Sequence, residues 1–325
     1  MAGDVRADRR CVAGRAVTLD PAYLEYPRRR AGYDHDLYAY SPLPQREPLH
    51  WPGGKAVAVW FCISLEWFPI LPADKPFRAP GHMQTAYPDY RHYTARDYGN
   101  RVGIYRLLDA FARHDIKVSV ATNAAIAQRY PSLVRDIVAA GHELIAHSTD
   151  MNGTIASTLG EDEERALIAG SVAALRQATG QAPQGWLSIA RSQSWNTHKL
   201  LKEAGISYCC DWVNDEMPWR FSAGGSGGLI NLPLNHELSD RQILNVQQQT
   251  IDSYAEQVLD AHDWLAQEAA ASGGGRLLPL HLTPYITGLP YRMDAFEALL
   301  AALAGRAETW FARGDEIVEI FGSNG

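Results

Sequence analysis

The sequence has no long apolar run and no block of charge of one sign. No stretch approaches the roughly 20 apolar residues of a transmembrane helix, and the first 20 residues lack the apolar segment of a signal peptide. The 30 basic and 37 acidic side chains are interspersed and give a net charge of −7, which excludes an extended basic surface. We therefore expect a cytoplasmic protein that binds neither nucleic acid nor membranes. Its partner is expected to be a small neutral or cationic molecule.

Cysteines are few and show neither metal-binding spacing nor a disulfide framework. Of the four, Cys62, Cys209 and Cys210 lie in apolar, strand-like runs, while Cys11 does not. This placement predicts buried thiols in a reducing compartment. The glycine-rich segment 224–228 lacks the lysine and the following helix of a nucleotide-binding loop. No cofactor is expected.

Strand-like and helix-like segments alternate along most of the chain. Residues 1–50 lack apolar periodicity, so they are predicted to be an extended N-terminal arm that wraps the domain or a neighbouring subunit and so favours a homo-oligomer. Residues 51–325 are predicted to be the catalytic domain. Strands are predicted at 56–65, 117–121, 143–146, 185–189, 208–212, 230–234 and 277–282, and helices at 101–114, 123–128, 131–140, 161–179, 198–204, 250–270 and 293–306. This alternation predicts an α/β fold, a distorted (β/α)7 barrel with a parallel sheet.

Ionisable side chains follow the predicted strands at their carboxyl ends, where α/β barrels carry their chemistry. We predict catalytic roles for Glu66, His147, Arg191, Asp211 and His281, and substrate-binding roles for Trp67, Trp186, Trp212, Asp215, Glu216 and His236.

Each of these residues also has a structural interpretation. Arg191 could pair with Asp211, His147 could be a hydrogen-bonded core histidine, and Glu66 could be a surface carboxylate. The acidic pair at 215–216 could form a solvated turn, and the tryptophans could pack in the core. His281 lies in an apolar strand, so its burial by itself requires a hydrogen-bonding partner.

Residues 51–292 resemble the polysaccharide deacetylase superfamily of the NodB-homology fold, within the branch of allantoinase-like and cyclic-imide-hydrolase-like proteins. The matching stretches occur in the family's order: WPGGKAVAV with ISLEW, RDYGNRVGIYRLLDAF, GHELIAHS, GWLSIARS with WNT, DWVNDEMPW and LPLHLTPYITGLPYR. The resemblance implies a distorted barrel of about seven strands. It also implies that Glu66 is the general base, that Arg191 orients the acidic residues and that His281 is the general acid.

The metal-dependent members of that family carry two adjacent aspartates in the first motif and two histidines four residues apart in the second. This chain has Glu66 followed by Trp67, and His147 with Met151 four residues later. A thioether is a poor zinc ligand. We therefore expect no metal, although Glu66, His147 and Asp150 would be the ligands if zinc were bound.

The loss of metal ligands bears on the substrate. Zinc lowers the pKa of bound water to about 7 and so supplies a strong nucleophile. Positioned acid and base groups accelerate a reaction by about 10²–10⁴-fold. A metal-free site favours an electrophilic C–N bond, as in cyclic imides and hydantoin-like ureides. The sequence thus predicts a hydrolase of non-peptide C–N bonds that acts on a small cyclic or linear amide or ureide. The alternatives are a carbohydrate N-deacetylase and a catalytically inactive, ligand-binding barrel.

Overall fold

The computed structural model describes residues 35–71, 88–222 and 227–323. The chain divides into two units, Met1–Asp36 and Leu37–Gly325. Most of the predicted N-terminal arm therefore lies outside the described residues. Its last part belongs to the second unit, where Leu37 is buried and its carbonyl accepts a hydrogen bond from Ser222 N at 2.7 Å. Within the described ranges, no helix is both long and apolar enough to cross a membrane.

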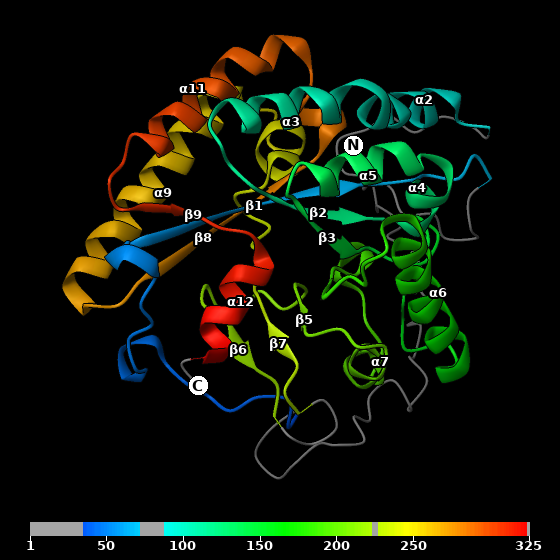
Figure 1. The fold of residues 1–325 in the computed structure, drawn as a ribbon, viewed down its shortest axis with the longest axis horizontal. Coiled ribbons are helices and arrows are strands. Elements are labelled where there is room, and N and C mark those ends of the chain that lie inside the picture. The colour runs from blue at the N-terminus through cyan, green and yellow to red at the C-terminus, as the bar shows by residue number, and fades with distance from the viewer. Residues whose placement is uncertain (1–34, 72–87, 223–226, 324–325) are drawn as a thin grey trace, which may run out of the picture. The chain divides into compact units, whose positions relative to one another are not determined.

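A nine-stranded, curled sheet forms the centre of the second unit (Figure 1). Its order is β6-β7-β5-β4-β3-β2-β1-β8, with β9 also on β1, and only the β6–β7 pair is antiparallel. The predicted α/β fold is confirmed, and the sheet has the form of a half-barrel. The strands are β1 (Val57–Leu65), β2 (Ser119–Thr122), β3 (Glu143–Ala146), β4 (Gly185–Trp186), β5 (Tyr208–Cys209), β6 (Trp219–Arg220), β7 (Ile230–Asn231), β8 (Arg276–Leu282) and β9 (Thr309–Phe311).

Helices precede and follow most of these strands. In Figure 1, α9 lies along β8 and α11 packs on α9. The α-helices are α2 (Tyr90–Tyr98), α3 (Ile104–Arg113), α4 (Ala124–Arg129), α5 (Pro131–Ala139), α6 (Glu161–Thr179), α7 (Thr197–Glu203), α9 (Ile251–Ser272), α10 (Pro284–Thr287), α11 (Met293–Ala304) and α12 (Gly314–Ser323), and two π-helical segments are η3 (Gly99–Gly103) and η5 (Arg241–Val246). Short 3-10 turns lie at Leu43–Gln45, Pro52–Gly54, Ile189–Arg191 and Pro290–Arg292.

Strand β1 pairs with β2, β8 and β9, and all nine of its residues are buried. One edge pairs with β9 at residues 57–59 and with β2 at residues 62–65, while the other edge pairs with β8. A strand covered on both faces reads as one continuous apolar run, which is why the sequence predicted it well. In the β8 register Cys62 lies opposite His281. Because side chains alternate along a strand, Ser64 and Glu66 lie on the same face as that histidine.

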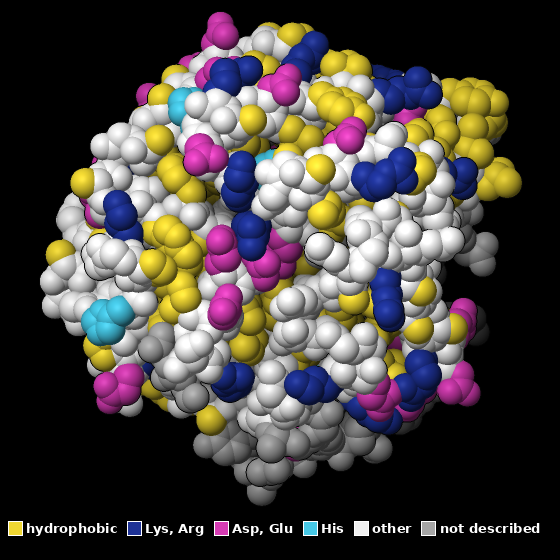
Figure 2. Space-filling view, in the orientation of Figure 1, with side chains coloured by type: hydrophobic (Ala, Val, Ile, Leu, Met, Phe, Trp, Pro, Cys, Tyr) yellow, Lys and Arg dark blue, Asp and Glu magenta, His cyan; other side chains and the backbone are white. Residues whose placement is uncertain are grey.

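The sequence prediction missed elements at both ends of the sheet. Helix α2 lies partly in a segment interpreted as loop, and β6, β9 and α12 were not predicted. The predicted strand at 185–189 ends at Trp186, because a 3-10 turn at Ile189–Arg191 interrupts it. The three cysteines predicted to be buried are buried and free. Figure 2 shows Lys, Arg, Asp and Glu side chains interspersed over the face that it draws.

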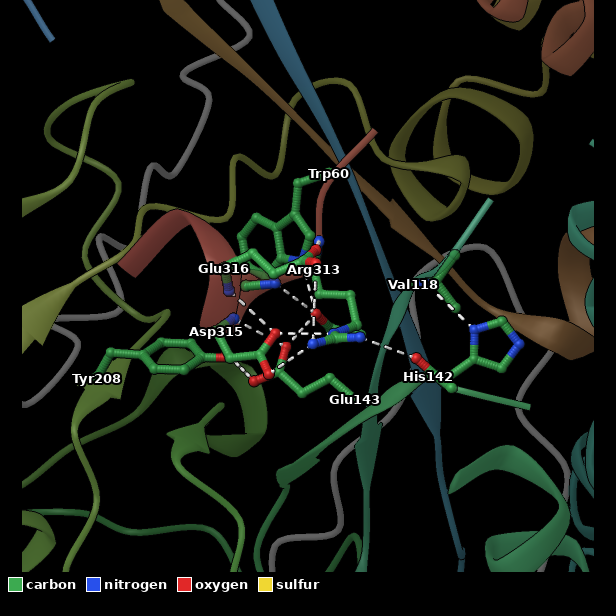
Figure 3. A network of polar contacts seen from close by, with 11 residues as sticks. Trp60, Val118, His142, Glu143, Tyr208, Arg313, Asp315 and Glu316 are labelled. Atoms are coloured by element: carbon green, nitrogen blue, oxygen red, sulfur yellow. Dashed lines mark hydrogen bonds and ion pairs between the residues drawn. The ribbon is translucent and has the colours of Figure 1, made fainter. Parts of the chain in front are cut away.

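A buried polar network joins the amino-terminal ends of the strands to α12 (Figure 3). The carboxylate of Glu143, the first residue of β3, accepts hydrogen bonds from Ser119 Oγ, from Tyr208 OH at 2.5 Å and from Asp315 N at 3.2 Å. Burial, followed by the nearby charge of Asp315, raises the pKa of Glu143 to about 7. The network lies at the opposite end of the strands from the candidate site, so we interpret it as structural.

Candidate active site

A cavity of about 420 Å³ opens at the carboxyl ends of the strands. It brings together five of the residues singled out in the sequence: Glu66, His147, Arg191, His236 and His281. These side chains come from positions more than 200 residues apart, and the parallel sheet places them at one edge. The other lining residues are Ser64, Met151, Leu187, Ser188, Ala190, Val213, Glu237, Ser239 and Arg241.

Glu66 follows directly after β1, and its carboxylate is buried and held in a fixed orientation. Oε1 accepts a hydrogen bond from Arg241 Nη2 at 2.8 Å, and Oε2 accepts one from Tyr285 OH at 3.0 Å. The backbone carbonyl of Glu66 accepts a hydrogen bond from Asn100 Nδ2 at 3.0 Å. A carboxylate has about four lone-pair positions. The described residues leave two of them without a donor, so a water molecule or a substrate can bind there.

Sequence reasoning missed Arg241 and Tyr285. The resemblance implies that Arg191 orients the acidic residues. In the structure, however, Arg241 contacts the Glu66 carboxylate. Arg241 is the first residue of the π-helical η5, a kind of segment that is rare and often found at functional sites. Tyr285 lies in the stretch LHLTPY that drew attention to His281. The position of Tyr285 close to His281 could therefore have drawn attention to it, but nothing in the sequence showed that the Tyr285 side chain points toward Glu66.

Close packing of η3 against α10 positions Tyr285. A Cβ atom on Gly99 would lie 2.8 Å from Tyr285 N, and one on Gly103 would lie 2.2 Å from Pro284 O. These glycines of the GNRVG segment are therefore required for the approach of two backbones. Asp240 holds the other side of α10, because its Oδ2 accepts hydrogen bonds from Thr283 N and from Thr287 Oγ1, and burial raises its pKa to about 6.

His147 follows β3 and presents a lone pair to the cavity. Its Nδ1 lies 2.6 Å from Leu187 O, which can only accept, so Nδ1 carries the proton and Nε2 does not. Nε2 is buried and has no hydrogen-bond partner in the described part of the chain. Burial lowers the pKa of His147, so the ring is neutral at neutral pH. The open Nε2 can accept a proton or a hydrogen bond from a ligand.

His281 lies in β8 with its Nε2 2.5 Å from Ser64 Oγ. Its pKa is well below the usual range because of burial and the positive charges of Arg191 and Arg241. The ring is therefore neutral at neutral pH. The general-acid role implied by the family resemblance consequently requires His281 to receive a proton before it can donate one.

Arg191 is half-buried in the cavity wall. Its Nη2 donates to Leu234 O at 2.7 Å, its Nε has no acceptor among the described residues, and none of their carboxylates forms an ion pair with it. The predicted alternative, a pair with Asp211, is not formed, because that carboxylate binds Ser188 N, Ser188 Oγ and Gln193 Nε2. Ala190 and Arg191 both have left-handed φ angles, 54° and 53°. Such backbone conformations are uncommon for these residue types and cluster at functional sites.

Most of the predicted substrate-binding residues lie away from the cavity walls. Trp186 is fully buried, and its Nε1 donates to Ser188 Oγ at 2.9 Å, so like Asp211 it positions Ser188 from behind. Trp212 donates to Gln193 Oε1 at 2.8 Å and packs against neighbouring aromatic rings. The remaining members are placed as follows: Trp67 lies under the Arg129 guanidinium, Asp215 pairs with Arg46, and Glu216 is exposed.

The side chains of the cavity do not form a zinc site. The Glu66 carboxylate is engaged by a guanidinium, Met151 offers a thioether, and Asp150 accepts a hydrogen bond from Asn152 N at 2.8 Å. His147 Nε2 is the open nitrogen donor. Across residues 35–71, 88–222 and 227–323 no group of three or more His, Cys, Asp and Glu side chains is arranged to hold a metal ion. This donor set does not fit tetrahedral zinc, which takes three or four such ligands.

A curled, mostly parallel half-barrel with a carboxylate and histidines at its strand ends defines a deacetylase-type α/β protein. A family model described as polysaccharide deacetylase matches residues 93–209. The chain is therefore similar to the polysaccharide deacetylase family. Members of this family are hydrolases and deacetylases of C–N bonds, and the family also contains pseudoenzymes.

Three similar proteins cover most of the chain. The crystal structure of PuuE allantoinase is 27% identical, with a TM-score of 0.77 over 92% of this chain and 98% of its own. A probable polysaccharide deacetylase from Pseudomonas aeruginosa PAO1 gives the same identity, TM-score and coverage. A Schizosaccharomyces pombe (strain 972 / ATCC 24843) protein assigned to the polysaccharide deacetylases is 24% identical over 243 residues, 69% of this chain and 73% of its own.

Proposed function

We propose that this protein hydrolyses a C–N bond in a small cyclic amide or ureide, with Glu66 as the base that activates water. The observation that carries the proposal is the fixed carboxylate of Glu66 in the cavity wall, held by Arg241 and Tyr285 with two lone-pair positions open. The cavity of about 420 Å³ suits a small molecule. The similarity to PuuE allantoinase supports a ring ureide as substrate.

The cavity residues supply each step of such a reaction. Glu66 takes a proton from water as the water oxygen bonds to the carbonyl carbon, and the carbonyl electrons move onto its oxygen. The positive charge of Arg241 in the cavity wall stabilises this oxyanion. When the electrons return, the C–N bond breaks, and the leaving nitrogen takes up the proton that His281 or His147 relays from Glu66. The neutral state of both histidines fits them to accept that proton.

The chemistry of the donor set favours ring amides over N-acetyl sugars. Because these side chains do not fit zinc, general acid and base groups must activate the water molecule. Such groups accelerate a reaction by about 10²–10⁴-fold. In cyclic imides and ureides the nitrogen lone pair is shared with a second carbonyl, so the C–N bond is already electrophilic. We accordingly propose that the reaction needs no cofactor.

The test compares substrates and one variant pair. The purified protein is assayed with succinimide, hydantoin, allantoin and chitooligosaccharide, with and without a chelator. We expect turnover of at least one ring compound, unaffected by the chelator. Glu66→Gln should lower kcat by about 10²-fold or more, because the base is lost. Glu163→Gln, an exposed site on α6, is the matched control and should retain full activity.

Two results would contradict this proposal. Full activity of Glu66→Gln on a ring compound would remove the assigned base. Chelator-sensitive deacetylation of chitooligosaccharide would instead support the second candidate function, carbohydrate N-deacetylation, which the names of the Pseudomonas aeruginosa and Schizosaccharomyces pombe relatives favour.

A further inference from the structure

We propose that Arg191 forms an anion-binding subsite of the cavity, and that the substrate is an amide or ureide that carries a carboxylate beside the bond that is broken. This inference rests on the proposed function for the identity of the reaction. The subsite itself rests on the charges and contacts of the cavity walls.

The charged groups that line the cavity leave one half-buried cation, Arg191, without a direct ion-pair partner among the described residues. Glu66 and Arg241 form an ion pair at 2.8 Å and offset each other. The other lining carboxylate, Glu237, is exposed. Arg191 therefore contributes a positive charge that no described carboxylate contacts directly; burial lowers its pKa, and the nearby charge of Asp211 raises it. A half-buried charge has lost part of its hydration, so a ligand that pairs with it gains binding free energy.

The histidines of the cavity report the same positive potential. The pKa values of His147, His236 and His281 are all lowered, first by burial; the charges of Arg191 and Arg241 lower them further, although Glu66 acts in the opposite direction on His147. Because these imidazoles are neutral, they cannot replace Arg191 in attracting an anion. The anion-binding character of the cavity is therefore centred on the guanidinium.

The guanidinium has hydrogen-bond donors available for a ligand. It has five N–H groups, of which one donates to Leu234 O, while its Nε is buried without an acceptor among the described residues. The left-handed backbone at Ala190 and Arg191 fixes the direction in which the side chain leaves the chain. A carboxylate can accept two parallel hydrogen bonds from one guanidinium, which gives both affinity and orientation. The net charge of −7 predicts a neutral or cationic substrate. The charge of the substrate depends, however, on the charged groups that line the cavity, and these favour an anion.

The experiment compares hydantoin, hydantoin-5-acetate and the methyl ester of hydantoin-5-acetate as substrates of the wild-type protein, Arg191→Gln and Arg191→Lys. For the wild type, we expect a KM for the acid that is about 10-fold or more below that of the ester. Arg191→Gln should raise the KM for the acid by about 10–100-fold, with kcat nearly unchanged, because a charge-assisted hydrogen bond is lost. It should leave the KM of the ester unchanged. Arg191→Lys should restore part of the affinity for the acid, since it keeps the charge and loses the planar fork.

The outcomes distinguish the subsite from other roles of Arg191. An equal loss of kcat for acid and ester in Arg191→Gln would show that the guanidinium stabilises the oxyanion, and would overturn the proposal. Equal KM values for acid and ester in the wild type would also overturn it. This wild-type comparison holds even if Arg191→Gln fails to fold.

If no ring compound is hydrolysed, the proposed function fails while the subsite is still tested. Calorimetric titration then compares succinamate, which carries a carboxylate and an amide, with the uncharged succinamide. Binding of succinamate alone, weakened in Arg191→Lys, would support the subsite. No binding of succinamate, or equal binding of both compounds, would overturn it.

Discussion

At the scale of single residues, the candidate site depends on how charges are paired. The two arginines of the cavity have different environments: Arg241 is paired with the Glu66 carboxylate, and Arg191 has no acidic partner in the described part of the chain. Residue type alone does not separate them. The difference comes from which strand end or helix each side chain projects from, and it gives each arginine a different expected role.

Arg241→Gln should reduce both activity and stability. The substitution leaves the buried Glu66 carboxylate without its cation, and breaking such a pair costs about 3–5 kcal/mol. Tyr285→Phe removes one neutral hydrogen-bond donor from the same carboxylate and should cost about 1 kcal/mol. Urea denaturation of both variants measures the difference. A smaller loss for Arg241→Gln than for Tyr285→Phe would show that the ion pair does not hold Glu66.

At the scale of elements, the site is built where two π-helical segments meet the strand ends. Segment η5 begins at Arg241, and η3 supplies Asn100, whose side chain holds the backbone carbonyl of Glu66. Segment η3 also packs on α10, which carries Tyr285. Side chains far apart in the sequence therefore reach Glu66 through the contacts between these short elements.

Gly103→Ala should destabilise the protein and displace α10. The added Cβ would lie 2.2 Å from Pro284 O, a backbone atom that cannot move away without moving the helix. Overpacking of this kind costs about 1–3 kcal/mol. Gly170→Ala, in the middle of α6 with no atom within 4 Å of the new Cβ, is the matched control and should stabilise by about 0.5–1 kcal/mol. Free energies of unfolding in urea measure both effects. Equal effects of the two substitutions would contradict the close approach of η3 and α10.

At the scale of the whole molecule, the two ends of the strands serve different purposes. The carboxyl ends hold the cavity with its open donors and acceptors, whereas the amino ends hold the satisfied network around Glu143. Ser119 on the neighbouring strand β2 and Tyr208 on β5, two strands away, bind this carboxylate, and the first turn of α12 closes over it. The network therefore links the sheet to the last helix of the chain.

The Glu143 network predicts a pH dependence of stability. The folded protein raises the pKa of Glu143 from 4.5 to about 7, so it binds the proton more tightly than the unfolded chain does. The resulting contribution is fully present below pH 4.5 and is lost as the pH rises through about 7.

Denaturation of the wild type and of Glu143→Gln over this pH range measures the effect. We expect the wild type to lose on the order of 3 kcal/mol relative to the variant as the pH rises. A difference between the two proteins that stays constant with pH would contradict the burial of this titrating group.

The sequence by itself determined the α/β class, because buried parallel strands such as β1 read as apolar runs and helices such as α6 show periodicity and end signals. It also identified Glu66, His147, Arg191 and His281, because polar residues that close apolar strands stand out locally. The short strands β6 and β9 were missed, since two or three residues carry too little periodicity.

Only the tertiary structure decided which of these side chains meet. The pairing of Glu66 with Arg241 and Tyr285, the unpaired state of Arg191 and the placement of Trp67, Trp186 and Trp212 behind or beside the cavity depend on contacts between distant segments. Local sequence records the type of each side chain and the element that carries it. The direction of a side chain after a strand ends, and the partner it finds there, depend on loop conformation and packing, which residue types alone leave open.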